Sequence, residues 1–174
     1  MRLRYDRNLK SLEGGHKHLI SPIIEKILLA NEGELFIEGH KVATVRTENT
    51  CLHAIMILNT VGYSSVPVLD REGRVAGKIS APLIFSGIKE ELCYNWDKLA
   101  ERRVSEDMST DVAVRDHGCQ LEDILHDLVN HSFICLVDES GFFRGIITRK
   151  EILKRVNFLA HEFEHKLEEM SKQG

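Results

Sequence analysis

The C-terminal part of the sequence contains a pattern that is typical of zinc hydrolases. His161-Glu162-Phe163-Glu164-His165 matches HExxH, which on a helix places two histidines one turn apart with a glutamate as general base. A catalytic zinc needs a third protein ligand as well. The nine residues after His165 contain no histidine, and Glu168 and Glu169 on the same helix could not easily reach the metal. We therefore expect no metal site and no catalytic residue here.

A second group of reactive side chains precedes that pattern. Thr148-Arg149-Lys150-Glu151 places a hydroxyl, two cations and a carboxylate in four successive residues. If Thr148 begins a helix, the two cations lie in its first turn, where unpaired N–H groups also attract phosphate. Arginine can then bind two phosphate oxygens, and lysine adds a point charge. Without further context, such charges are usually solvated surface residues.

The sequence around these residues is written twice. GYSSVPVLDREGRVAGKIS, residues 62–80, matches NHSFICLVDESGFFRGIIT, residues 130–148, position by position. With one residue dropped, the match continues upstream, so that Leu52 and Ile55 face Leu121 and Ile124. A unit of about 55–60 residues is too small for a comfortable core of its own. Two units are expected to pack into one object of ordinary domain size.

Each unit predicts the same order of elements. Apolar spacing predicts a helix over 19–30 before the first unit. The units then predict an extended segment (41–45 and 112–114), a helix (from Thr50 to Gly62, and 120–129), a hairpin (66–79 and 133–147) and a closing helix (from Ser80 and from Arg149). The first of these helices has Leu52, Ile55, Met56 and Val61 as its expected apolar face, and the last has Ile152, Val156, Leu159, Phe163, Leu167 and Met170.

Composition excludes several classes of protein. A hydrophobic fraction of 43% and a charged fraction of 29% are typical of a folded chain. A net charge of −4 is a poor match to nucleic acid, which needs a basic face. The sequence has no apolar run of about 18 residues for a membrane span and no signal-peptide core. The four cysteines form no CxxC pair, so we expect reduced thiols and a cytoplasmic protein.

The repeat and its motifs resemble a tandem pair of CBS domains. The resemblance rests on residues 62–70 with Gly77-Lys78-Ile79-Ser80, and on Val137-Asp138 with Gly145-Ile146-Ile147-Thr148. It implies an α/β (α+β) fold with pseudo-two-fold symmetry, in which two sheets pack together and leave two clefts for adenine nucleotides. The expected division is an N-terminal extension with one helix (1–34), a first CBS domain (35–90), a linker (91–103), a second CBS domain (104–160) and a C-terminal helix extension (161–174).

A closer resemblance is to the stand-alone CBS proteins of the CbpB/DarB type. It rests on Lys41-Val42-Ala43, residues 62–70 and Thr148-Arg149-Lys150. Such proteins are receptors for cyclic di-AMP in Gram-positive bacteria, and they contact protein partners, notably the bifunctional (p)ppGpp synthetase/hydrolase. The resemblance implies a regulatory protein with no cofactor besides this ligand. The implied ligand site comprises Lys41, Val42, Ala43, Thr44, Tyr63, Ser64, Ser65, Thr148, Arg149, Lys150 and Glu151.

These residue types suit a cyclic dinucleotide. Lys41 would add a third cation, Val42 and Ala43 would present backbone groups to adenine, and Tyr63 would lie against a base or ribose. Ser64 and Ser65 would bind phosphate or sugar. The simpler interpretations are a plain strand, a core or edge aromatic residue, and serines that satisfy turn backbone.

The two expected clefts differ in their charges. Where one has Arg149, Lys150 and Glu151, the other has Ala81, Pro82 and Leu83 after Ser80. We therefore expect one occupied cleft per chain. Sensing of AMP, ADP or ATP is an alternative, because Glu151 could accept from a ribose hydroxyl, and a ligand-free adaptor is another. We also expect a homodimer, with apolar surface supplied by the 152–170 stripe and the helix 19–30.

Overall fold

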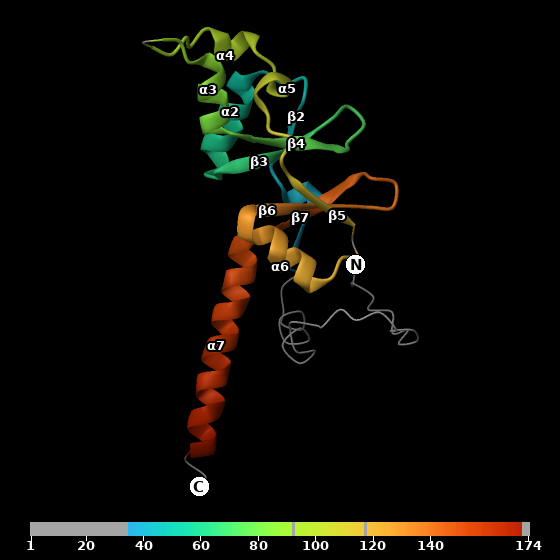
Figure 1. Cartoon of the computed structure of the whole chain (residues 1–174), viewed down its shortest axis with the longest axis vertical. Helices are drawn as coiled ribbons and strands as arrows, with labels where there is room; N and C mark the ends of the chain where they lie inside the picture. Colours follow the sequence, from blue (N-terminus) through green and yellow to red (C-terminus); the bar gives the residue numbers. More distant parts are fainter. Residues whose placement is uncertain (1–34, 92, 117, 172–174) are drawn as a thin grey trace.

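Two small sheets lie face to face between two groups of helices (Figure 1). The computed structural model describes residues 35–91, 93–116 and 118–171, so the predicted N-terminal extension with its helix over 19–30 lies outside the described residues. The architecture confirms the predicted α/β class with two similar units.

The first sheet has the strand order β2-β3-β4. β2 pairs in parallel with β3, and β3 pairs antiparallel with β4. The strands are β2 (Val45–Arg46), β3 (Ser65–Leu69) and β4 (Val75–Ser80). The helices of this unit are α2 (Cys51–Val61), α3 (Ala81–Ile88), α4 (Lys98–Glu101) and α5 (Val104–Asp107). α4 lies in the predicted linker, 91–103.

The second sheet has the order β1-β7-β6-β5 and contains a strand from the beginning of the described chain. The strands are β1 (Phe36–Glu38), β5 (Ala113–Asp116), β6 (Phe133–Val137) and β7 (Phe143–Thr148), and the helices are α6 (Leu121–Asn130) and α7 (Arg149–Ser171). β1 pairs with β7, although its residues fall in the predicted first domain. The first sheet likewise pairs with a residue of the predicted second domain. The Ser109 backbone forms two hydrogen bonds with Lys78 of β4, of 2.8 and 2.9 Å.

The predicted helix ends agree with the structure because their capping chemistry is local. The Thr50 hydroxyl accepts a hydrogen bond from the His53 N–H and begins α2. Gly62 ends that helix with φ 66°, a left-handed conformation that glycine adopts without steric cost. Ser80 caps α3 in the same way as Thr50 caps α2.

The predicted apolar face of α2 is confirmed for Ile55 and Val61, which pack against the core of the first unit, and is wrong for Leu52 and Met56. The structure buries Cys51, Ala54 and Leu58, and leaves Leu52 and Met56 exposed. These buried residues correspond to Leu121, Ile124 and Leu128 of α6, seventy positions later. The chain between the first helix and its hairpin is therefore two residues longer than in the second unit, whereas the sequence alignment allowed for one.

The expected extended segment over 41–45 is also shorter than predicted. Lys41 ends a 3-10 helix, η1 (Gly39–Lys41), and only Val45 of that segment belongs to a strand. Val42 has extended backbone angles, with φ −96° and ψ 126°. The segment 42–44 connects η1, which follows the second sheet's β1, to β2 of the first sheet.

The two units meet through an apolar layer and through their hairpin turns. Phe133, Cys135 and Ile146 form the layer, with Val42 and Val75 packed against it. Burial raises the pKa of the Cys135 thiol to about 12, so this cysteine is an inert core residue.

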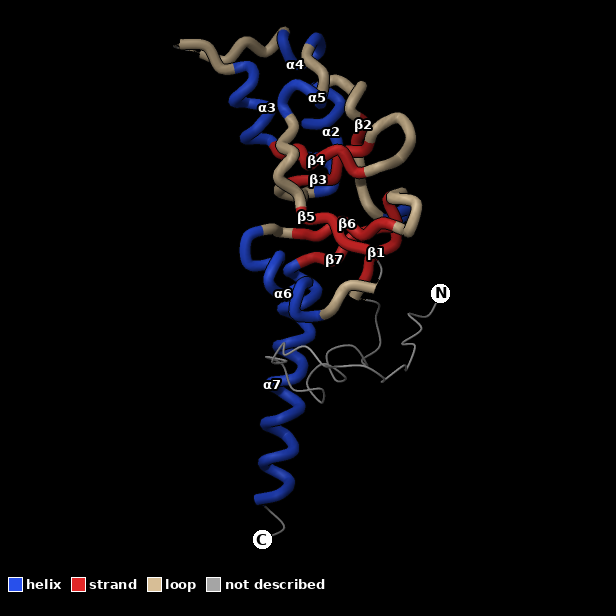
Figure 2. Tube along the Cα trace, turned by 45° about the vertical axis from the view of Figure 1, so that its right-hand side comes forward, coloured by secondary structure: helices blue, strands red, loops and turns tan. Residues whose placement is uncertain are grey.

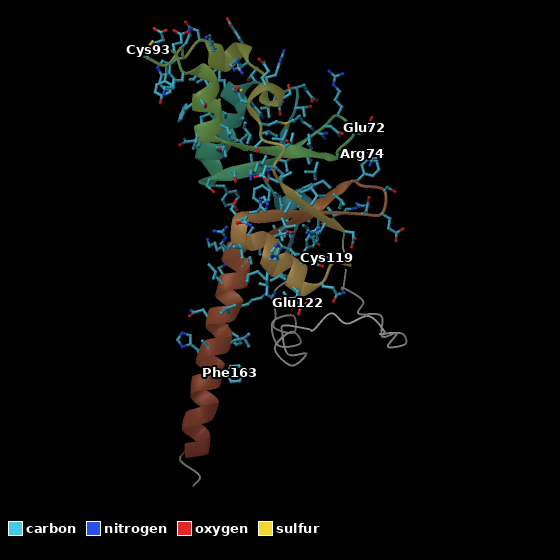
Figure 3. All side chains as sticks on the ribbon, in the orientation of Figure 1. Glu72, Arg74, Cys93, Cys119, Glu122 and Phe163 are labelled. Atoms are coloured by element: carbon cyan, nitrogen blue, oxygen red, sulfur yellow. The ribbon has the colours of Figure 1, made fainter. Side chains whose placement is uncertain are left out.

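At the turns, the Phe143 N–H donates to the Gly73 carbonyl (3.1 Å). The guanidinium of Arg74 lies over the Phe142 ring, 4.7 Å from its centroid. Figure 3 shows Arg74 on the first hairpin, on the side of the second hairpin's turn.

The last helix projects away from both sheets. Only the first part of α7 lies beside α6 and the second sheet, and the remainder extends beyond them (Figure 2). Among the described residues, no helix has the length and apolar character needed to cross a bilayer.

Candidate ligand-binding site

The predicted site begins where β7 passes into α7. Thr148 ends β7, and its hydroxyl accepts a hydrogen bond from the Glu151 N–H (3.2 Å). Ser80 accepts from the Leu83 N–H (3.4 Å) at the equivalent place in the first unit. Each closing helix therefore begins with a hydroxyl cap, and the sequence prediction of a helix start at Thr148 is confirmed.

Arg149 has a structural role at this turn. Its Nε donates to the Leu128 carbonyl (2.8 Å), and its Nη2 donates to the carbonyls of Val129 and His131 (3.3 and 3.0 Å). The guanidinium thus caps the C-terminus of α6, where a cation is favoured. These bonds engage the donors of Nε and Nη2 and do not use the two N–H groups of Nη1, which can still donate to a phosphate.

Ser132 joins this turn to the first unit. Its hydroxyl lies 3.4 Å from the hydroxyl of Ser65, and its carbonyl accepts from the Arg149 N–H (3.0 Å). Two predicted site residues from different units are therefore brought together through a residue that the sequence analysis did not name. The repeat gave the signal, because Ser132 aligns with Ser64 of the predicted site.

Lys41 lies toward the other end of the β1–β7 pair. β1 runs from Phe36, opposite Ile147, to Glu38, opposite Gly145, and η1 continues in that direction. The Lys41 ammonium forms an ion pair with Glu38 (3.1 Å), and this contact lowers the pKa of the Glu38 carboxyl. Lys41 and Thr148 therefore lie toward opposite ends of the β1–β7 strand pair.

The segment after Lys41 passes between the two sheets. Val42 packs against the apolar layer that joins the sheets, and Ala43 packs against the core of the first unit. In the second unit Val112 and Ala113 occupy matching places. The two segments are related as the pseudo-two-fold symmetry requires.

The remaining predicted site residues differ in accessibility. Tyr63 and Ser64 follow the Gly62 cap and are exposed, with 55% of the Tyr63 surface accessible. Lys150 is exposed in the first turn of α7. Glu151 forms an ion pair with Lys154 (2.7 Å), so its carboxylate is already partly compensated.

The second predicted cleft has a different charge pattern. The position equivalent to Lys41, seventy residues later, is Asp111, whose carboxylate pairs with Lys78 (3.4 Å). Ala81 and Pro82 stand where Arg149 and Lys150 stand in the other cleft. A cation is thus replaced by an acid, and two cations are replaced by uncharged residues.

One polar atom beside the turn has no hydrogen-bond partner within the described part of the chain. It is Nδ1 of His131, which is buried and belongs to the residue preceding Ser132. Buried polar atoms are nearly always bonded, so an unsatisfied nitrogen here is consistent with a ligand or water partner.

A shallow hollow of about 480 Å³ lies elsewhere, on the first unit. It is lined by Thr47, Glu48, Arg71, Arg103 and Ser105. Arg103 donates through Nη1 to the Glu48 carbonyl (2.9 Å). None of the predicted site residues lines this hollow.

The HExxH residues lie on the projecting part of α7. In the described parts of the chain, no three histidine, cysteine or acidic side chains are grouped to hold a metal. The side chains of Glu162, Glu164 and His165 lie outside the described set.

Comparison with known proteins identifies the family. The family model described as CBS domain matches residues 37–82 and again residues 104–157. The chain therefore belongs to the CBS-domain proteins and contains two such domains in tandem.

Individual proteins within that family are similar to this chain over most of its length. The chain is 32% identical over 139 residues to cyclic di-AMP receptor B of Bacillus subtilis (strain 168), which covers 80% of this chain and 95% of the relative. The CbpB protein of Listeria monocytogenes, solved in complex with c-di-AMP, is 40% identical, with a TM-score of 0.68 over 72% of this chain and 94% of that one. CbpB from Streptococcus agalactiae is 28% identical, with a TM-score of 0.73 over 88% and 96% of the two chains.

Proposed function

We propose that this protein is a receptor for cyclic di-AMP that regulates a partner protein. The ligand lies between the segment 41–44 of the first unit and the turn 148–151 of the second. Lys150 and Nη1 of Arg149 meet phosphate, Ser65 and Thr148 border it, and the backbone of Val42 and Ala43 faces an adenine. Tyr63 and Ser64 contact a base or sugar.

The difference in charge between the two clefts carries this proposal. The cleft that we propose has Lys41, Arg149 and Lys150 at its predicted positions, whereas the pseudo-symmetric positions are Asp111, Ala81 and Pro82. A cyclic dinucleotide has two phosphates and needs this concentration of cations. The similarity to a receptor and to a structure bound to c-di-AMP supports the same ligand. We infer one ligand per chain.

Calorimetric titration tests the ligand. Cyclic di-AMP, AMP, ADP, ATP and cyclic di-GMP are titrated into the protein, into Lys150→Ala and into Lys89→Ala. Lys89→Ala is the control, because it removes the same charge as Lys150→Ala. Lys89 is exposed on the first unit, away from the turn 148–151. We expect cyclic di-AMP to bind with one site per chain and Lys150→Ala to weaken it about tenfold, since a charge-assisted contact contributes about 1.4 kcal/mol.

The control Lys89→Ala should bind like the wild type. Equal weakening in both variants would mean that only net charge matters, and the assigned cleft would be wrong. Tighter binding of AMP, ADP or ATP would instead identify a mononucleotide sensor. Glu151 is the observation that favours this second candidate, because it can accept from ribose hydroxyls once Lys154 releases it. If none of the five nucleotides binds, the ligand-free adaptor is the function that the result supports.

The partner and the assembly are further parts of the proposal. The resemblance to CbpB/DarB proteins supports the (p)ppGpp synthetase/hydrolase as partner, in the cytoplasm and within the stringent response. A ligand changes partner affinity only through its different affinities for the two states of the receptor. We also propose a homodimer, for which the exposed Leu52 and Met56 of α2 provide apolar surface that the sequence analysis assigned to the core.

A further inference from the structure

The helix α7 has two kinds of apolar residue. Ile152 and Leu159 are buried in the core of the second unit, in one cluster with Leu35 and Leu121. Leu153, Val156, Ala160 and Phe163, which we call the α7 stripe, are exposed. Their spacing of three, four and three residues places them along one side of the helix, next to the buried edge.

The α7 stripe is too apolar for a surface that only water covers. Leu153, Val156 and Phe163 are 59%, 47% and 51% exposed. Phe163 extends from the part of α7 that has passed the second sheet (Figure 3). Another side of the same helix carries Lys150, Lys154 and Asn157, with Phe158, 46% exposed, at its edge. The composition therefore changes around the helix as it does in one that contacts a neighbour.

The described part of the chain begins close to this place. Leu35 is buried in one core cluster with Ile152 and Leu159, so the described chain begins near the first turns of α7. The four residues 31–34 can span up to about 14 Å, which allows a preceding helix to lie alongside α7.

The same segment has a complementary apolar pattern. Residues 19–30 carry Ile20, Ile23, Ile24, Ile27 and Leu28 at helical spacing. Ile20 to Leu28 would span about 12 Å of helix, and Leu153 to Phe163 spans about 15 Å, so the two apolar faces match in length.

We propose that residues 19–30 of this chain form a helix that packs antiparallel against the α7 stripe. The packing is antiparallel because residues 19–30 lead along the chain toward Leu35, near the first turns of α7, whereas α7 runs away from those turns. The packing completes the second unit with a helix pair and is independent of the nucleotide site. A helix pair of this kind would cover the four stripe residues and leave the polar side of α7 in solvent.

Hydrogen exchange of the full chain tests the proposal. The variants are Val156→Glu and Phe163→Glu, each of which places a charge in the α7 stripe. Asn157→Glu is the matched control, because it introduces the same charge at an exposed position on the polar side of the helix. We expect amides of residues 19–30 to exchange slowly in the wild type and in the control, and at least tenfold faster in both stripe variants.

Equal exchange of residues 19–30 in the stripe variants and the control would overturn the proposal. A disulfide test identifies the occupant, with Ile24→Cys and Val156→Cys in a Cys93→Ser, Cys119→Ser background. Oxidation should give a cross-linked monomer on a non-reducing gel. A cross-linked dimer would overturn the proposal, because the stripe would then be covered by a second copy of the chain.

Discussion

Several charged side chains stabilise backbone groups, and one of them, Arg149, was predicted as a ligand contact. Asp138 accepts hydrogen bonds from the N–H groups of Ser140 and Phe142, 3.0 and 2.9 Å away, and fixes the tight turn of the second hairpin. Asp70 does the same for Glu72 and Arg74 in the first hairpin. Arg149 uses three hydrogen bonds on the end of α6. The residue type alone did not distinguish these structural functions from recognition.

Arg149 is expected to affect stability as well as binding. Arg149→Ala removes the cap of α6 and should lower the free energy of unfolding by about 1 kcal/mol, since this exposed side chain makes charge-assisted bonds to carbonyls. Arg149→Lys keeps the charge but not the fork of donors, and should recover only part of that loss. Urea unfolding of the three proteins measures the differences. Identical unfolding of all three would show that the cap contributes nothing.

The turn carboxylate of Asp138 gives a dependence of stability on pH. The Phe142 N–H, assisted by Arg144, lowers the pKa of this carboxyl below its usual value. Its contribution is therefore fully present above the unfolded pKa of about 3.9 and is lost as pH falls through the lower folded value. The melting temperature of Asp138→Asn should lie below that of the wild type at pH 7, and the gap should close in acid.

Glu139→Gln provides the control for that measurement, because Glu139 is an exposed carboxylate in the same turn. Its melting temperature should follow the wild type at every pH. A gap for Asp138→Asn that persists at the lowest pH would contradict the assignment.

At the scale of elements, the face of α2 that is buried distinguishes the alignment of the two repeats seen in the structure from the one predicted from sequence. The structure buries Leu58 at 4% exposure and leaves Met56 60% exposed. Leu58→Ala should therefore cost about 2–5 kcal/mol of unfolding free energy, through lost burial and the cavity that remains. Met56→Ala should change the unfolding free energy of the monomer by less than about 0.5 kcal/mol. Denaturant unfolding of the pair decides, and a larger loss for Met56→Ala would restore the register predicted from sequence.

The elements that sequence predicted well are those with local chemistry. The hairpins, the Thr50 and Ser80 caps, the Gly62 stop and the start of α7 depend on residues within one turn of each other. The face of α2 was misjudged because Leu52 and Met56 make an apolar pattern that is also helical. Neither periodicity nor capping reports which of two apolar sides meets the sheet.

The candidate site was predictable only in part for the same reason. The repeat and its motifs indicated Thr148, Lys150 and Ser65, whose places follow from the ends of predicted elements. Ser132 and the capping by Arg149 depend on contacts between α6, β6 and β3, which no local pattern records. The pairing of Lys41 with Glu38 depends in turn on η1, where an extended segment was expected.

At the scale of the whole molecule, the two units are not separate along the chain. β1 comes before the strands of the first sheet in the sequence, but it pairs with β7 of the second sheet. Ser109 belongs to the predicted second domain, but its backbone bonds to Lys78 of β4 in the first sheet. Because β1 bonds to β7 over Phe36, Ile37 and Glu38, the ordering of each sheet depends on residues that the other half of the sequence supplies. We therefore expect the two domains to unfold as one cooperative unit.

The strand exchange has a consequence for a chain that is cut. A nick in the loop 89–97 would break the covalent link without parting the halves, so that fragments 1–92 and 93–174, produced together, should copurify and melt as a single species. Made separately, the C-terminal piece would expose the open edge of β7, where unpaired backbone invites self-association. The protein would thus tolerate proteolysis between its repeats far better than the excision of either one.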